Sequence, residues 1–125
     1  MQILKDKITI TELKQMNIQH RTLAAGRWNQ LSFIEQMANI GSETNRALNW
    51  QTKQNASYSQ QAFIRALELL DLTLGDKKNV KRLKEIARLR ETLVDYFLGS
   101  NEYNSSSYSM KKYFDHFAFA ARNRF

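Results

Sequence analysis

The sequence predicts an all-α protein whose four helices form an antiparallel up-down bundle with an N-terminal extension. Apolar residues recur at helical spacing in four long segments. Proline is absent, and glycine occurs only four times in 125 residues. Most connections are short, which favours antiparallel neighbours. The length fits one bundle domain at residues 26–125, preceded by an N-terminal arm or extension at residues 1–25.

The first two helices are expected at residues 31–54 and 58–74. The buried stripe of the first helix would comprise Phe33, Ile34, Met37, Ile40, Thr44, Ala47 and Leu48. Gly41 interrupts this stripe and predicts close approach of another helix, because glycine otherwise costs a helix about 1 kcal/mol. Ser57 and Gln60 are placed to form a capping box. The apolar face of the second helix would comprise Ala62, Phe63, Ala66, Leu67, Leu69 and Leu70.

The third and fourth helices are expected at residues 77–98 and 108–122. Asp76 is placed to cap the third helix. Gly75 and Gly99 stand where left-handed caps would end the second and third helices. The apolar face of the third helix would comprise Val80, Leu83, Ile86, Ala87, Leu93, Val94 and Phe97. That of the fourth would comprise Tyr113, Phe114, Phe117, Ala118 and Ala121.

Composition excludes several classes of protein. There is no cysteine, which rules out disulfides and thiolate metal sites and favours a reducing cytoplasm. The sequence contains no run of about 18 apolar residues, so we expect no membrane-spanning helix. The first residues lack the apolar stretch of a secretory signal. Nineteen Lys and Arg oppose 12 Asp and Glu, so the net charge is +7. This excess favours a polyanion as partner.

The positive charge is concentrated in the third expected helix. Seven of the fourteen residues from 77 to 90 are Lys or Arg, and only Glu85 opposes them. In a continuous helix, Lys77, Lys81, Lys84 and Arg88 share one face. Lysines at a helix N-terminus oppose the macrodipole, which indicates that the charge has another use. The predicted nucleic-acid-binding residues are Lys77, Lys78, Lys81, Arg82, Lys84, Arg88, Lys111, Lys112, Arg122 and Arg124.

These residues would form one continuous cationic surface if the third and fourth helices pack side by side. Four aromatic residues lie near the charge, and their rings could stack on unpaired bases: Tyr103, Tyr108, Tyr113 and Phe125. Tyr103 and Tyr108 fit this role better, because Tyr113 is expected in the core and Phe125 at a frayed chain end. RNA is expected as ligand more than DNA. The alternative is a protein-interaction bundle whose charge serves solubility or an acidic partner.

Enzyme signatures are nearly absent. The chain has two histidines, His20 and His116, and no HExxH, P-loop, GxGxxG or GxSxG motif. We therefore expect no catalytic residue, no cofactor and no metal. The competing interpretation makes His116 a general acid or base acting on RNA.

A short stretch at residues 89–97 bears on that alternative. Its Arg90, Leu93, Val94 and Tyr96 follow, in type and order, the signature region of HEPN domains, which this stretch resembles. HEPN domains are small helical bundles, many of them toxin ribonucleases. Asp95 stands near the place of the family's histidine, which handles the 2′-hydroxyl proton or holds the phosphate. The resemblance implies a HEPN-like ribonuclease or its inactive relative.

The basic residues Lys77, Lys81, Lys84 and Arg88 also carry a resemblance of the whole chain. With four helices, strong basicity and no catalytic set, the chain resembles Avd, the accessory protein of diversity-generating retroelements, and related bundles encoded within ribosomal RNA genes. The resemblance implies a pentameric ring that binds RNA and a reverse transcriptase through basic surfaces.

Aromatic residues predict self-association or a stable complex with a larger protein. Phe117 and Phe119 point to nearly opposite sides of a helix, so one of them would be exposed. Exposed aromatic residues often mark an interface. The predicted oligomer or partner interface comprises Trp28, Trp50, Phe119 and Phe125.

Overall fold

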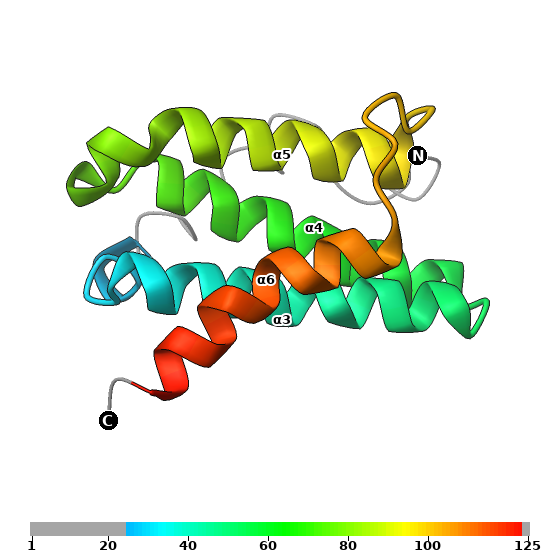
Figure 1. Ribbon diagram of the computed structural model, residues 1–125, viewed down its shortest axis with the longest axis horizontal. Helices are drawn as coiled ribbons and strands as arrows, with labels where there is room; N and C mark the ends of the chain where they lie inside the picture. The colour runs from blue at the N-terminus through cyan, green and yellow to red at the C-terminus, as the bar shows by residue number, and fades with distance from the viewer. Residues whose placement is uncertain (1–24, 124–125) are drawn as a thin grey trace, which may run out of the picture.

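The computed structural model describes residues 25–123, which contain four long α-helices and one short 3₁₀ helix but no strand (Figure 1). The elements are α3 (Phe33–Thr52), α4 (Ala56–Leu74), the 3₁₀ helix η1 (Lys77–Arg82), α5 (Leu83–Leu98) and α6 (Ser107–Arg122). The all-α class is therefore confirmed for this part of the chain. The predicted arm lies outside the described residues, except for Ala25, which lies in a helical turn that ends at Trp28.

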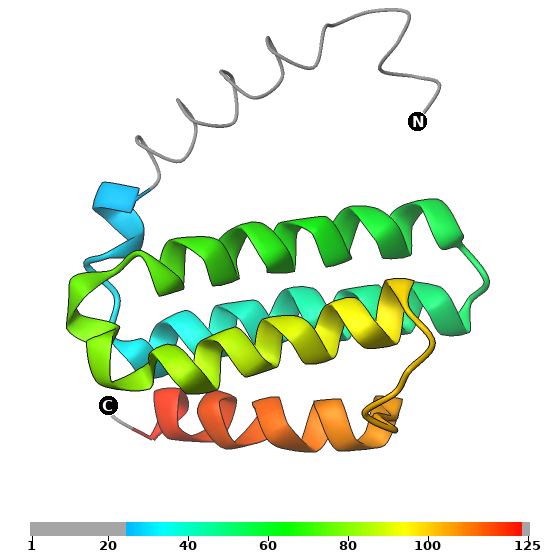
Figure 2. The ribbon, with the colours of Figure 1, turned by 90° about the horizontal axis from the view of Figure 1, so that it is seen from above.

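Helix α3 has the two most extensive helix–helix interfaces, one with α4 and one with α6. A tight turn at residues 53–55 reverses the chain, so that α4 returns beside α3 (Figure 2). Helix α5 packs on α4 through a smaller interface. In Figure 2 it lies between α4 and α6 and in front of α3. Its outer side is consequently the top surface of the molecule in Figure 1.

Side-chain caps determine where the helices begin. Ser32 Oγ accepts the N–H of Glu35, and the Ser32 N–H donates to the Glu35 carboxylate, which starts α3. Helix α4 begins two residues earlier than predicted, because Asn55 Oδ1 accepts the N–H of Tyr58 at 3.0 Å. The capping box predicted from Ser57 and Gln60 is therefore wrong. Asparagine is as good an N-cap as serine.

The glycines that follow α4 and α5 end these helices without the predicted left-handed conformation. Gly75 has φ of −82°, and Gly99 has φ of −100°. The N–H groups of both residues still bond to carbonyls of the last helical turn, at Asp71 and Asp95 respectively. Neither glycine has a backbone conformation that requires glycine. The two helices end because the segments that follow them leave the helix axis.

The prediction for the third helix is wrong over its first six residues. They form η1, with non-helical dihedrals at Asn79 (φ −94°, ψ 15°), and the α-helix begins at Leu83. A 3₁₀ helix has three residues per turn, so Asp76 and Asn79 point to the same side, and both are buried. Val80, predicted to be buried, is consequently 64% exposed. Leu83 and Ala87 are exposed as well.

Side chains of all four α-helices meet in one apolar core. Its fully or almost fully buried members include Met37, Ile40, Leu48, Leu70, Ile86, Leu93 and Phe114. Burial of each such side chain stabilises the fold by about 1.5–3 kcal/mol. These seven residues were all predicted from helical spacing, because the period of 3.6 residues holds along most of each helix.

Gly41 brings α3 and α6 into close contact, as its position predicted. A Cβ atom at residue 41 would lie 2.8 Å from the Cβ of Phe114. The Cβ of Phe114 is attached directly to the backbone of α6, so rotation of the ring cannot relieve this overlap. Only a shift of one helix against the other would make room.

We expect Gly41→Ala to lower the free energy of unfolding by about 1–3 kcal/mol, which is the usual cost of overpacking. Alanine stabilises a helix by about 1 kcal/mol relative to glycine. The expected loss is therefore the cost of the steric overlap after this gain in helix propensity has been subtracted. Urea unfolding followed by circular dichroism measures it. Gly26→Ala is the matched control, because a Cβ there meets nothing within 4 Å. An unchanged or higher midpoint for Gly41→Ala would contradict the steric argument.

Candidate nucleic-acid interface

A buried network of side-chain hydrogen bonds holds η1 against α3. Gln36 Nε2 donates to Asp76 Oδ2 at 2.8 Å. Asn79 Nδ2 donates to Gln36 Oε1 at 2.9 Å and to the Thr73 carbonyl at 3.0 Å. All four residues are buried. Because a buried polar group without a partner costs about 1–3 kcal/mol, these pairings favour the η1 conformation over a continued α-helix.

Trp28 belongs to this network and not to the surface interface that the sequence predicted for it. Its indole N–H donates to Thr73 Oγ1 at 3.0 Å, and its carbonyl accepts from Gln36 Nε2 at 3.0 Å. The residue is only 9% exposed. A buried indole needs a partner for its N–H, and a threonine hydroxyl on α4 supplies it. The prediction for Trp28 is therefore wrong.

Asp76 carries a buried negative charge that Lys78 compensates. Its Oδ1 accepts the N–H of Lys78 at 3.1 Å, and its Oδ2 accepts from the ammonium group of the same residue. Burial alone would raise the pKa of the Asp76 carboxyl, but hydrogen bonds from Lys78 and Gln36 outweigh burial and hold this pKa below its ordinary value. Lys78 Nζ also donates to the Asn29 carbonyl at 3.0 Å. Lys78 is thus largely a structural cation.

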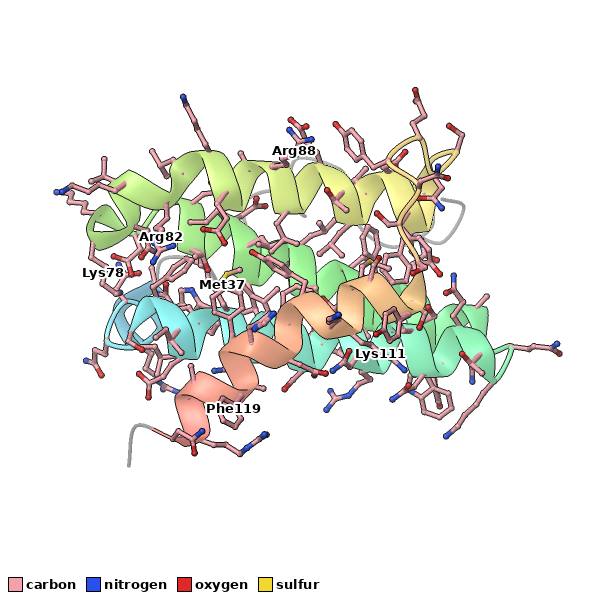
Figure 3. All side chains as sticks on the ribbon, viewed as in Figure 1. Met37, Lys78, Arg82, Arg88, Lys111 and Phe119 are labelled. Atoms are coloured by element: carbon pink, nitrogen blue, oxygen red, sulfur yellow. The ribbon has the colours of Figure 1, made fainter. Side chains whose placement is uncertain are left out.

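Further cations surround the network on the outside. Figure 3 shows Lys78 and Arg82 at this end of the molecule and Arg88 further along α5. Arg82 is divided between an ion pair with Glu85, at 3.2 Å, and the ring of Phe33, 4.7 Å away. On η1 and the first turn of α5, three exposed lysines take part in no ion pair within residues 25–123, and we call them the open lysines: Lys77, Lys81 and Lys84.

The second half of α5 has the opposite charge. Glu91 accepts from the Tyr103 hydroxyl at 3.1 Å, a bond that raises the pKa of Tyr103. Asp95 accepts the N–H groups of Glu102 and Tyr103 at 2.8 and 3.0 Å. Arg88 lies over the ring of Tyr103 at 5.7 Å. The cationic surface is therefore confined to η1 and the first half of α5.

Lys111, one of the predicted basic residues of α6, lies apart from the open lysines. Lys111 Nζ donates to Asn49 Oδ1 of α3 at 3.3 Å, and Figure 3 shows Lys111 far from Lys78. Lys112 lies 5.8 Å from the ring of Tyr108. Arg122 is exposed in the last turn of α6, and Arg124 lies outside the described residues. Lys111 thus faces α3, and it does not extend the surface of the open lysines.

The aromatic residues expected to stack on bases divide into two groups. Tyr113 is half-buried against Phe114 and Phe117, and its hydroxyl donates to Glu85 at 2.7 Å. Burial and this bond raise the pKa of Tyr113 far above its ordinary value. Tyr103 is 48% exposed and Tyr108 73% exposed, so both rings are accessible. Phe125 lies outside the described residues.

Two of the aromatic residues predicted for a protein interface remain at the surface. Trp50 is half-buried, packs edge to face on Tyr58 with ring centroids 4.8 Å apart, and lies under Lys53. Phe119 is exposed on α6 (Figure 3). Each stands near the C-terminus of its helix, and these two ends lie at opposite ends of the molecule (Figure 1). They do not form one patch.

Residues of the HEPN-like stretch have structural partners. Arg90 Nε donates to Asp71 Oδ1 at 2.8 Å, and Tyr96 donates to Gln51 at 3.4 Å. His116 is exposed on α6. Within residues 25–123, no group of three His, Asp or Glu residues is placed to hold a metal ion. In the same range no helix is long and apolar enough to cross a membrane.

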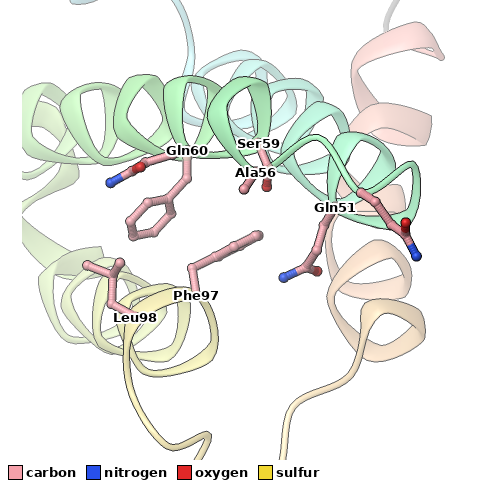
Figure 4. Close-up of a pocket in the computed structure, with 8 residues that line it drawn as sticks. Gln51, Ala56, Ser59, Gln60, Phe97 and Leu98 are labelled. Carbon is pink, nitrogen blue, oxygen red and sulfur yellow. The ribbon is translucent and has the colours of Figure 1, made fainter.

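Two cavities have no open lysine in their lining. One, of about 320 Å³, is at the opposite end of α4 from η1 (Figure 4). Phe63 and Phe97 pack together in it with ring centroids 4.9 Å apart, and three glutamine side chains surround them: Gln51, Gln54 and Gln60. The other, of about 270 Å³, lies between α5 and α6 and has a mostly apolar lining. A phosphate-binding site on the open lysines is therefore a surface and not a cavity.

No family model, curated protein or solved structure matches this chain. The interpretation of the surface therefore depends on its own geometry. The sequence identified Asp76 as a cap but missed its partners Gln36 and Asn79. One local signal was present in the sequence. Asn79 follows the cap residue Asp76 by three positions, and two short polar side chains at this spacing lie on one face of a 3₁₀ turn.

We expect Asn79→Ala to lower the free energy of unfolding by about 2–4 kcal/mol. The substitution removes two hydrogen bonds and leaves the Gln36 and Thr73 oxygens buried without that donor. Urea unfolding measures the loss, and Asn39→Ala on the exposed side of α3 is the control. Equal stability of the two variants would show that the network contributes little.

The depressed pKa of Asp76 predicts a pH dependence of stability. The unfolded-state value is near 3.8 and the folded-state value is lower, so the stabilisation is complete well above pH 3.8 and is lost as the pH falls below it. The difference in unfolding free energy between the wild type and Asp76→Asn should shrink over that range. Denaturant titrations at several pH values measure it, and a difference that stays constant down to pH 2.5 would contradict the assignment.

Proposed function

We propose that this protein binds nucleic acid, RNA in preference to DNA, through the open lysines around η1, and that it does so without catalysing a reaction. The observation that carries the proposal is the exposure of three lysines that no carboxylate of residues 25–123 neutralises. Phosphate oxygens are the ligands that such ammonium groups match, and their contacts dominate the affinity of nucleic-acid binding.

The way η1 is anchored supports this proposal. Asp76 is turned inward and is compensated by Lys78, so η1 itself presents no free carboxylate to repel a phosphate. The buried bonds of Asn79 hold the turn in place. The open lysines therefore project from a fixed segment. Binding then costs the conformational entropy of the lysine side chains but not that of the backbone.

The exposed ring of Tyr103 supports RNA as the preferred ligand. Its ring lies beneath Arg88, one helical turn after Lys84, so a charged group and an aromatic face stand beside the basic surface. Unpaired bases stack on such faces, and single-stranded segments are commonest in RNA. Base stacking of this kind carries little sequence information.

The finer description of the fold and of the partners belongs to the same proposal. We infer an antiparallel up-down four-helix bundle in which η1 forms one corner. The resemblance to Avd would make the protein partner a reverse transcriptase, the ligand its RNA and the location the cytoplasm. Its support is the all-helical fold together with the basic corner.

RNA binding at several salt concentrations tests the proposal. The affinity of the wild type for a single-stranded RNA, measured by fluorescence anisotropy, should fall as salt rises. Lys77→Glu/Lys81→Glu should weaken binding at least about tenfold. It should also reduce the slope of log K against log salt by about 1.4, because each contact to a single strand contributes about 0.7.

The matched control reverses the same number of charges elsewhere, with Arg46→Glu/Lys53→Glu near the C-terminus of α3. An equal loss in the control would show that net charge, and not the open lysines, carries the binding. No binding by the wild type at low salt would contradict the proposal and favour a protein-interaction bundle. Cleavage of the RNA that is lost in His116→Ala would favour the HEPN-like alternative.

A further inference from the structure

The outer side of α5 carries a stripe of residues that are exposed or only partly buried. Five residues recur at spacings of three and four and so share one face of the helix: Lys84, Ala87, Glu91, Val94 and Leu98. Leu98 is 64% exposed, Ala87 is exposed, and Val94 is half-buried. This is the spacing by which two helices pack along a common seam.

Helix α4 adds a further apolar side chain beside this stripe. The ion pair between Arg90 and Asp71, at 2.8 Å, joins the two helices, which run in opposite directions (Figure 2). Residues late in α5 therefore lie beside residues early in α4. Ile64, two turns before Asp71, is 45% exposed and lies toward the Leu98 end of the stripe. Exposed Leu and Ile side chains on adjacent helices are typical of an interface.

The charges of the stripe select its partner. Lys84 lies three residues before Ala87, and Glu91 lies four residues after it. When two α5 helices pair in opposite directions about a two-fold axis at Ala87, Lys84 of each copy lies opposite Glu91 of the other. A complementary helix must be acidic where α5 is basic and basic where α5 is acidic. A second α5, reversed, meets this requirement.

We propose that α5 forms such an antiparallel contact with α5 of a second copy of this chain, giving a two-fold symmetric dimer. The small side chain of Ala87 lets the two helices approach at the axis. Lys84 has no ion pair within residues 25–123, and the Glu91 carboxylate is held at the surface by Tyr103. An interface of this kind, in which the same patch serves both subunits, is the commonest in homo-oligomers.

The contact is independent of the proposed nucleic-acid binding. Among the open lysines only Lys84 lies on the stripe, because Lys77 and Lys81 belong to η1. Lys77→Glu/Lys81→Glu should therefore lose RNA binding and keep the dimer. Failure of one proposal does not imply failure of the other, because mass and RNA affinity are measured separately.

Charge reversal tests the pairing. Lys84→Glu and Glu91→Lys each place like charges opposite one another at both ends of the contact, so either variant should raise the dissociation constant of the dimer about tenfold or more. An equimolar mixture of the two variants should associate again, because both pairs then join opposite charges. Sedimentation equilibrium measures all three samples, and Lys53→Glu, at the far end of α3, should leave the dimer unchanged.

A cysteine at the axis tests the geometry. The chain has no cysteine, so Ala87→Cys supplies the single thiol of the full-length protein, and mild oxidation should link two copies through residue 87. Ser42→Cys, exposed on α3, is the control and should stay unlinked. The proposal is overturned by a wild type that is monomeric at every concentration, by variants that do not associate when mixed, or by equal linkage of the two cysteine variants.

Discussion

The hydrogen bond that Gln36 donates to Asp76 and the one that it accepts from Asn79 determine where the chain turns from α4 into α5. Gln36 lies on the core side of α3, where its amide has no access to water and must find its partners within the protein. Asp76, the N-cap of η1, and Asn79 within it supply them, so the turn takes the three-residue period that places both on one side. The start of α5, the place of Trp28 and the outward direction of the open lysines all depend on this constraint.

The described part of the protein combines two kinds of packing. Between α3, α4 and α6 the contact is apolar and close enough for Gly41 to touch Phe114. At the η1 end it is polar, and a buried carboxylate requires a cation beside it. The dense basic segment therefore has two roles, because Lys78 and Arg82 partly neutralise nearby carboxylates and the open lysines do not.

Helical spacing predicted the core well, because Met37, Ile40 and Phe114 lie in segments where the α-helical period is unbroken. It failed at Val80, since the period changes at η1 and the phase of the helix cannot be carried across that change. The partners of Asp76 were beyond prediction for another reason. Gln36 and Asp76 are forty residues apart, and only the packing of α3 against the α4–η1 corner brings them together. The composition of the basic segment likewise did not show which cations have partners.

Lys77 and Lys78 are adjacent in the sequence and both exposed, but their ammonium groups differ in reactivity. Lys78 Nζ reacts with an acylating reagent only after its bonds to Asp76 and to the Asn29 carbonyl break. The product would leave the Asp76 carboxylate buried without a counter-charge, which is strongly unfavourable. Lys77 is exposed and meets no such barrier. The rate of modification at Lys78 therefore reports opening of the η1 corner, and the neighbouring lysine reports only its own exposure to solvent.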